Sequence, residues 1–224
     1  MAIADWPDSE RPRGKLINSG AHSLSDAELL AVFLRTGVRG SSAVELAMNL
    51  ITGFGSLRGI LRASRDEFCA LPGLGNSKYA ELQAANELVQ RCLRETLLRE
   101  DVFTNSRMTR EYVKSRLIDR GREIFLCLFL DSQNRLIAQE ELFLGTIDGA
   151  SVHPREVIKR ALHHNAAAII FAHNHPSGVS EPSQADISIT HRLKNLLSEV
   201  DIRTLDHLIV GDGEVKSLAE QGHL

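Results

Sequence analysis

The chain has 224 residues, of which 43% are hydrophobic and 25% are charged, a composition typical of a globular protein with one or two hydrophobic cores. Its net charge of -3 excludes a strong overall attraction for nucleic acid, so any DNA contact would have to be local. The longest apolar stretches, Phe125 to Leu130 and Ala166 to Ala172, are far shorter than the roughly 20 residues that a membrane-spanning helix needs.

The N-terminus and the cysteines indicate a cytoplasmic protein. Acidic residues crowd the N-terminus, which has no continuous apolar segment, so no secretory signal is expected. The three cysteines, Cys69, Cys92 and Cys127, are too far apart for a disulfide framework or a four-thiolate metal site. We expect all three to be buried thiols.

Residues 1–100 are expected to form a small bundle of helices, because apolar residues recur at helical spacing. Gly37 and Gly53 stand where helix C-termini favour a left-handed residue, and a longer helix is expected from about Ser77 to Leu98. Helix starts are marked by three Ser-x-x-Glu capping boxes, which begin at Ser25, Ser42 and Ser64.

The segment Leu71-Pro72-Gly73-Leu74-Gly75 lies between two expected helices and resembles the hairpin of a helix-hairpin-helix module. By that resemblance, the backbone around Gly73 and Gly75 and the charge of Lys78 would contact a DNA phosphate without reading bases. Tyr79 departs from the usual pattern, which has a small residue there for close helix packing. The alternative is that this Pro-Gly-x-Gly turn only joins two helices.

The pattern changes near residue 101, so two domains are expected, over residues 1–100 and 102–224. In the second domain strands alternate with helices, which is typical of an α/β fold. Strands are expected over residues 124–131, 135–143, 166–172, 202–210 and 214–218, with helices over 154–165 and 183–200.

Three residues of this domain have the spacing of a one-metal site. His173 and His175 are two apart in an extended segment, which Pro176 favours, so both imidazoles can point to the same side. Asp186 would join them from the first turn of a helix that begins near Ser183. Two histidines and a carboxylate leave a fourth position open for water, as in catalytic zinc sites. The alternative is that Ser183 and Asp186 form only a capping box.

The order His-x-His, seven residues, Ser, two residues, Asp matches the JAMM signature. Over residues 102–224 the chain thus resembles a RadC-like protein of the JAMM (MPN+) metalloprotease family, with further matches at residues 143–146, 152–156 and 205–208. The resemblance implies a cytidine-deaminase-like α/β/α sandwich, the MPN domain, with Zn2+ held by His173, His175 and Asp186. The domain of residues 1–100 would be a small all-α helix-hairpin-helix domain.

The same resemblance implies a catalytic glutamate at the start of an earlier strand. Glu123 directly precedes the apolar strand at Ile124 and is our candidate for the general base, with Glu141 in reserve. Ser183 would donate its hydroxyl to the developing oxyanion. The predicted function is therefore zinc-dependent metallopeptidase or isopeptidase activity on an unknown peptide or protein amide.

Two other functions fit parts of the sequence. One is a DNA-repair-associated DNA-binding protein whose metal site is structural or inactive. The other is a metal nuclease, prompted by the consecutive letters His-Asn-His, but such nucleases spread these residues over a ββα finger, so we consider the match accidental. Among the remaining histidines, His207 is expected to be a structural residue rather than a metal ligand.

Overall fold

The computed structural model describes residues 6–99, 106–118, 120–145 and 152–224. The chain divides into two compact units, a helical unit (Met1–Val89) and a sheet unit (Gln90–Leu224). The domain boundary predicted near residue 101 lies outside the described residues. Among the described residues, no helix is both long and apolar enough to cross a membrane.

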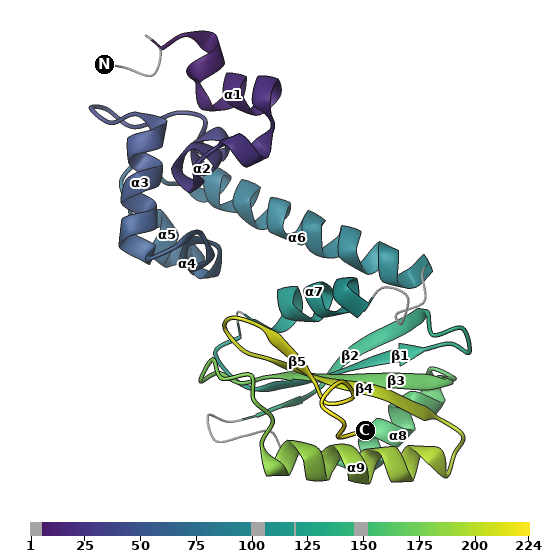
Figure 1. Cartoon of the computed structure of the whole chain (residues 1–224). Helices are drawn as coiled ribbons and strands as arrows, with labels where there is room; N and C mark the ends of the chain where they lie inside the picture. Colours follow the sequence, from purple (N-terminus) through teal and green to yellow (C-terminus); the bar gives the residue numbers. More distant parts are fainter. Residues whose placement is uncertain (1–5, 100–105, 119, 146–151) are drawn as a thin grey trace. The chain divides into compact units, whose positions relative to one another are not determined.

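The helical unit is built around a core of aliphatic side chains and Phe68, which is fully buried. Short helices pack around this core (Figure 1). Its elements are the 3-10 turns η2 (Asp8–Glu10) and η3 (Ala21–Ser23) and the helices α1 (Pro12–Ser19), α2 (Asp26–Leu34), α3 (Ala43–Phe54), α4 (Leu57–Arg62), α5 (Arg65–Cys69) and α6 (Asn76–Arg99), the last of which continues into the sheet unit.

The three predicted capping boxes are confirmed, because Ser25, Ser42 and Ser64 each exchange hydrogen bonds with the glutamate three residues later. The prediction that Gly37 and Gly53 end helices is wrong. Gly53 lies inside α3, which ends instead at the left-handed Gly55 (φ 78°), and α2 ends at Arg35 before Gly37 is reached.

The sheet unit is a mixed α/β structure whose five strands and last two helices begin and end within two residues of the predicted bounds, whereas the helix at Ser106–Leu117 was not predicted. Five strands run in the order β2-β1-β3-β4-β5, and the β3–β4 pair is the parallel one. The elements are α7 (Ser106–Leu117), β1 (Ile124–Leu130), β2 (Leu136–Leu144), α8 (Pro154–His163), β3 (Ala168–Asn174), α9 (Gln184–Ser198), β4 (Arg203–Val210) and β5 (Val215–Ser217).

Helices cover both faces of this sheet, with α7 on one face and α8 and α9 on the other (Figure 1). Successive residues of a strand point to opposite faces, and β1 is fully buried along its length. Its even-numbered side chains, such as Leu126, pack against α7, while its odd-numbered side chains, such as Phe125, face α8 and α9. The same alternation in β3 directs His173 toward α9 and Asn174 toward α7.

Cysteine burial differs from the expectation. Cys127 is completely buried in the middle of β1, and burial raises the pKa of its thiol well above the ordinary value. Cys69 is only half-buried and Cys92 is exposed on α6, so the prediction that all three are buried is wrong for Cys92.

An ion-pair cluster joins β2 to α8 on the face that also carries the odd-numbered β1 side chains. Glu140 accepts hydrogen bonds from Arg160, one of them at 2.6 Å to Nε, and lies 2.7 Å from His164 Nε2. The Arg160 guanidinium, helped by His164, lowers the pKa of Glu140 to about 2. The side chains of Glu140, Arg160 and His164 are less than one-third exposed, so solvent screens this cluster less than an ordinary surface pair.

Glu140→Gln is expected to destabilise the protein by about 2 kcal/mol at pH 7, because it removes a partly buried charge that is paired in the folded state. The folded-state pKa of Glu140 is depressed, so its contribution is present above the ordinary pKa of 4.5 and is lost as the pH falls toward 2. Urea denaturation of both proteins across this range checks the prediction. A difference in stability that does not shrink between pH 5 and 2 would contradict it.

Candidate metal centre

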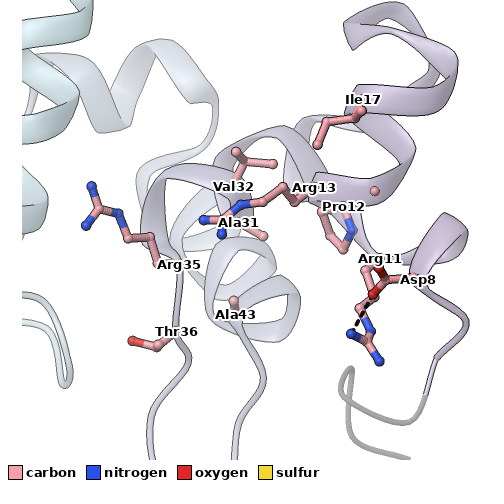
Figure 2. Close-up of a pocket in the computed structure, with 11 residues that line it drawn as sticks. Asp8, Arg11, Pro12, Arg13, Ile17, Ala31, Val32, Arg35, Thr36 and Ala43 are labelled. Atoms are coloured by element: carbon pink, nitrogen blue, oxygen red, sulfur yellow. Dashed lines mark hydrogen bonds and ion pairs between the residues drawn. The ribbon is translucent and has the colours of Figure 1, made fainter.

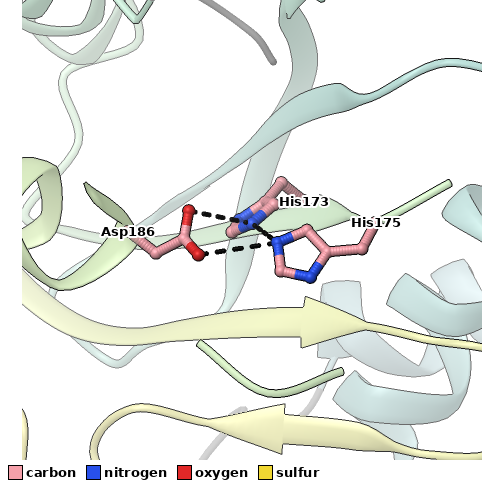
Figure 3. Close-up of side chains that lie close together, drawn as sticks. All are labelled: His173, His175 and Asp186. Carbon is pink, nitrogen blue, oxygen red and sulfur yellow. Dashed lines mark hydrogen bonds and ion pairs between the residues drawn. The ribbon is translucent and has the colours of Figure 1, made fainter. Parts of the chain in front are cut away.

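The structure brings together the three residues that the spacing singled out (Figure 3). His173 is the sixth residue of β3, His175 follows the end of that strand, and Asp186 lies in the first turn of α9. His173 Nε2 lies 2.9 Å from His175 Nε2 and 3.2 Å from Asp186 Oδ1, and His175 Nε2 lies 3.5 Å from Asp186 Oδ2. Their ligand atoms all lie within 4.8 Å of one another, so the group could hold a metal ion.

The electrostatics of the group suit a cation. Although burial alone would raise the pKa of Asp186, hydrogen bonds from His173 and His175 hold it far below its ordinary value. The hydrogen bond to Asp186 raises the pKa of His175 against the effect of burial. The ionised carboxylate and the two imidazoles can together bind a metal cation. The cation would take the place of the protons that the imidazoles share with the carboxylate.

A chain of hydrogen bonds fixes which nitrogen of His173 faces the centre. Thr190 Oγ1 donates its single proton to the backbone carbonyl of Asp186 (2.5 Å), because a carbonyl can only accept. The same hydroxyl must therefore accept the hydrogen bond from His207 Nδ1 (2.5 Å). His207 is fully buried, which lowers its pKa well below the ordinary value and keeps the ring neutral. Its Nε2 then accepts from His173 Nδ1 (2.8 Å), so His173 Nε2 is the nitrogen that faces Asp186 and would coordinate a metal ion after losing its proton.

His175 is oriented in the same way by a backbone carbonyl. Its Nδ1 donates to Val179 O at 2.7 Å, so its Nε2 is the nitrogen that faces Asp186 and would coordinate a metal ion after losing its proton. The loop after His175 is held to the β4–β5 turn, where Asp212 N donates to Gly178 O at 2.9 Å. Gly178 has φ 82°, and a Cβ there would come within 2.4 Å of the Asp212 carboxylate, so only glycine fits this approach.

The sequence interpretation left His207 outside the site, whereas the structure places it directly behind His173. The local pattern gives no signal for this contact, because the two histidines are 34 residues apart. The signal lies in the sheet. β4 pairs with β3 in parallel, and His207 lies opposite Phe171 with its side chain on the same face as His173.

The two interpretations of Ser183 and Asp186 turn out to be compatible. Ser183 Oγ and N donate to Asp186 Oδ2 at 2.6 and 2.7 Å, and Asp186 N donates back to Ser183 Oγ at 3.2 Å, which is a complete capping box. Asp186 Oδ1 is left for His173. The helix start therefore holds the carboxylate in the position that a metal ligand would need.

Glu123 lies at the edge of the same centre. β1 and β3 pair with Phe125 opposite His173, and Glu123 directly precedes β1. Its negative charge contributes to the raised pKa of His175. Its backbone is fixed on both sides by Asn174, which accepts from Ile124 N at 2.9 Å and donates to the carbonyls of Arg122 (3.1 Å) and Arg120 (3.3 Å).

The reserve candidate for the base, Glu141, lies elsewhere. It pairs with Leu126 across β1 and β2, so its side chain is on the α7 face of the sheet, opposite to the face of His173. Its carboxylate accepts from Arg116 at 3.1 Å and from Arg120 at 3.0 Å.

The residues predicted to contact DNA have structural roles in the helical unit. Gly73 has φ 79°, and a Cβ there would lie 1.8 Å from Val38 Cγ1. Lys78 Nζ donates to Gly73 O at 2.9 Å and to Thr36 O at 3.2 Å, while a Cβ on Gly75 would meet open space. The DNA contact through Gly73, Gly75 and Lys78 stays a prediction, and the Gly73→Ala variant would disturb packing whether or not DNA binds.

Comparison with known proteins agrees with the geometry. Residues 103–223 match the family described as a RadC-like JAB domain, and residues 3–80 match the one described as UPF0758 N-terminal. Curated relatives share the full length, among them UPF0758 proteins of Nitrosococcus oceani (61% identical, 100% of both chains), Marinomonas sp. (59%, 99% of both) and Cellvibrio japonicus (58%, 100% of both). The chain therefore belongs to the UPF0758 family of RadC-like JAB domain proteins, and the resemblance inferred from the sequence is confirmed.

Proposed function

We propose that this protein is a zinc-dependent amide hydrolase, a metallopeptidase or isopeptidase. The observation that carries the proposal is the convergence of His173 Nε2, His175 Nε2 and the Asp186 carboxylate, with the Nδ1 of each imidazole tied to a second partner. Two nitrogens and one oxygen suit zinc and leave a coordination position open, whereas structural zinc sites use four protein ligands.

The proposal includes the finer fold assignment. A mixed sheet between α7 on one face and α8 and α9 on the other is compatible with a cytidine-deaminase-like α/β/α sandwich of the MPN type. For the helical unit, the turn between α5 and α6 is compatible with a helix-hairpin-helix module. Its contact with DNA through Gly73, Gly75 and Lys78 is a separate proposal that the metal centre does not need.

A zinc ion bound here would supply a Lewis acid and lower the pKa of the attacking water toward ~7. Glu123 would take a proton from that water at its carboxylate and later deliver it to the leaving amine. Asn174 would hold the backbone on both sides of Glu123 so that the carboxylate stays beside His175. Ser183 would turn its hydroxyl from Asp186 to the oxyanion, while its backbone N–H keeps the carboxylate in place.

Metal depletion tests the proposal directly. Wild-type protein is expected to bind one zinc ion per chain, to cleave members of a peptide and isopeptide library, and to lose turnover on chelation and regain it with zinc. His175→Ala should lose both zinc and turnover. His191→Ala is the matched control, because His191 is exposed on α9, outside the candidate site, and its Nε2 bonds to the carbonyl of His223.

The outcomes separate the two functions. Turnover that follows zinc content supports the hydrolase. One tightly bound zinc ion with no turnover on any amide, in wild type and control alike, would favour the alternative, a DNA-associated protein whose metal is structural.

A further inference from the structure

In the part of the helical unit that the structure describes, a hollow of about 540 Å³ is lined by charged groups that do not converge. Figure 2 shows that the guanidinium groups of Arg11, Arg13 and Arg35 point apart. Arg11 and Arg35 are also paired with carboxylates. The polar groups that do converge, apart from the three candidate ligands, lie behind His173 in the sheet unit.

Thr190 is the buried polar residue of α9, one helical turn after Asp186. Its exposed fraction is 0%, and the other buried residues of this helix are the aliphatic Leu193 and Leu197. A hydroxyl in such a position costs free energy unless it is hydrogen-bonded. Thr190 is bonded as donor and as acceptor, because it donates to the Asp186 carbonyl and accepts from His207.

The bonds of Thr190 connect two candidate ligands that come from separate elements. His207 Nε2 lies 2.8 Å from His173 Nδ1, and His207 Nδ1 lies 2.5 Å from Thr190 Oγ1. Thr190 Oγ1 lies 2.5 Å from the Asp186 carbonyl, and the Asp186 carboxylate faces His173 Nε2 at 3.2 Å. These four residues thus form a closed ring of polar contacts. His207 is also 0% exposed, so solvent does not take the place of Thr190 as its partner.

Metal binding would permit one direction of the bonds in this ring. A metal ion on His173 Nε2 leaves the proton of that imidazole on Nδ1, so His207 Nε2 has to accept. The proton of the neutral His207 ring is then on Nδ1, where Thr190 Oγ1 is its acceptor. The metal-binding arrangement therefore depends on a hydroxyl whose hydrogen bonds reach no ligand side chain.

The opposite direction is open to the metal-free protein. His173 can then carry its proton on Nε2, which faces Asp186 Oδ1, and its Nδ1 can accept from His207 Nε2. His207 Nδ1 carries no proton in this arrangement, so no buried N–H of the ring needs Thr190 as its acceptor. Loss of the Thr190 hydroxyl should therefore penalise the metal-bound arrangement more than the metal-free one.

We propose that Thr190 is a positioning residue, which acts through His207 to keep His173 in the tautomer that binds metal. The proposal rests on the metal site of the proposed function, but it does not need amide hydrolysis. Valine has nearly the shape of threonine and lacks the hydroxyl, so a substitution by valine separates this role from packing.

Thr190→Val is expected to bind zinc at least about tenfold more weakly than wild type, because the buried His207 N–H loses its acceptor in the metal-bound state. Thr190→Ser keeps the hydroxyl and should restore most of the affinity. Thr52→Val is the matched control, since Thr52 on α3 also donates to the carbonyl four residues earlier, at 2.9 Å, and should bind zinc like wild type. Affinity is measured on the full chain by competition with a chromophoric chelator.

Nitrogen-15 chemical shifts of the histidine side chains report the tautomers without any need for turnover. In zinc-loaded wild type, His207 and His173 should each carry their proton on Nδ1. This measurement tests the proposal even if Thr190→Val does not fold, which thermal unfolding in EDTA would reveal.

Three results would overturn this proposal alone. They are a zinc-loaded wild type in which His207 carries its proton on Nε2, equal zinc affinities in Thr190→Val and Thr52→Val, and a Thr190→Ser variant that binds zinc as weakly as Thr190→Val. A wild type that binds no zinc would overturn the proposed function together with this proposal, whereas zinc binding without turnover would overturn only the hydrolase.

Discussion

Asp186→Asn is expected to weaken zinc binding by at least ~100-fold. Because the carboxylate also pairs with His173 and His175 in the absence of metal, some loss of stability is expected as well. Asparagine preserves the shape of the side chain, and its oxygen can still accept from Ser183 N and so keep the start of α9 capped. It removes the negative charge that, in the proposed site, would attract a cation to His173 and His175. Zinc affinity is measured by competition with a chromophoric chelator, and stability by thermal unfolding in EDTA.

Ser183→Ala is the matched control and should lose stability while it keeps its zinc affinity. It removes the hydroxyl half of the capping box, at a cost of about 1 kcal/mol, but leaves the three ligands intact. Equal losses of zinc affinity in the two variants would mean that Asp186 affects zinc binding only by capping α9, and not as a ligand.

Glu123→Gln is expected to lower turnover by ~10²–10⁴-fold with no loss of bound zinc, because the amide cannot accept the proton from the attacking water. The backbone at this position is held by Asn174, so the isosteric substitution should not move it. Turnover at saturating substrate and zinc content per chain are measured on the same samples.

Glu141→Gln serves as the comparison, because Glu141 is the other acid considered for the base and lies on the opposite face of the sheet. It should lose its pairs with Arg116 and Arg120 and some stability, yet keep its turnover. A drop in turnover in Glu141→Gln as large as that in Glu123→Gln would refute the assignment.

Apart from α7, which was not predicted, the elements of the sheet unit were predictable because each has a local cause. β1 and β3 are continuous apolar runs that end at polar residues, and α9 starts at a capping box that is visible in the sequence. The grouping of the three candidate metal ligands was predictable for the same reason, since all three lie within 14 consecutive residues at the end of one strand and the start of one helix.

What the sequence did not reveal depends on tertiary contacts. His207 reaches His173 only because β3 and β4 are parallel neighbours, and strand order is not a local property. Asn174 reads as a spacer between two histidines until β1 is placed beside it. Arg35 ends α2 in a strained turn although Gly37 stands two residues later, and no propensity rule selects arginine for positive φ.

The chain of hydrogen bonds from Thr190 through His207 to His173 implies that the chain must fold before it can bind zinc tightly. Thr190 comes from α9 and His207 from β4, so neither can fix the tautomer of His173 before the β3–α9–β4 crossover has closed. We therefore expect the unfolded chain to be a poor competitor for zinc, and ion capture to be a late event in maturation. The cellular zinc supply would then limit the fraction of folded protein that contains bound zinc. It would not limit the folding rate.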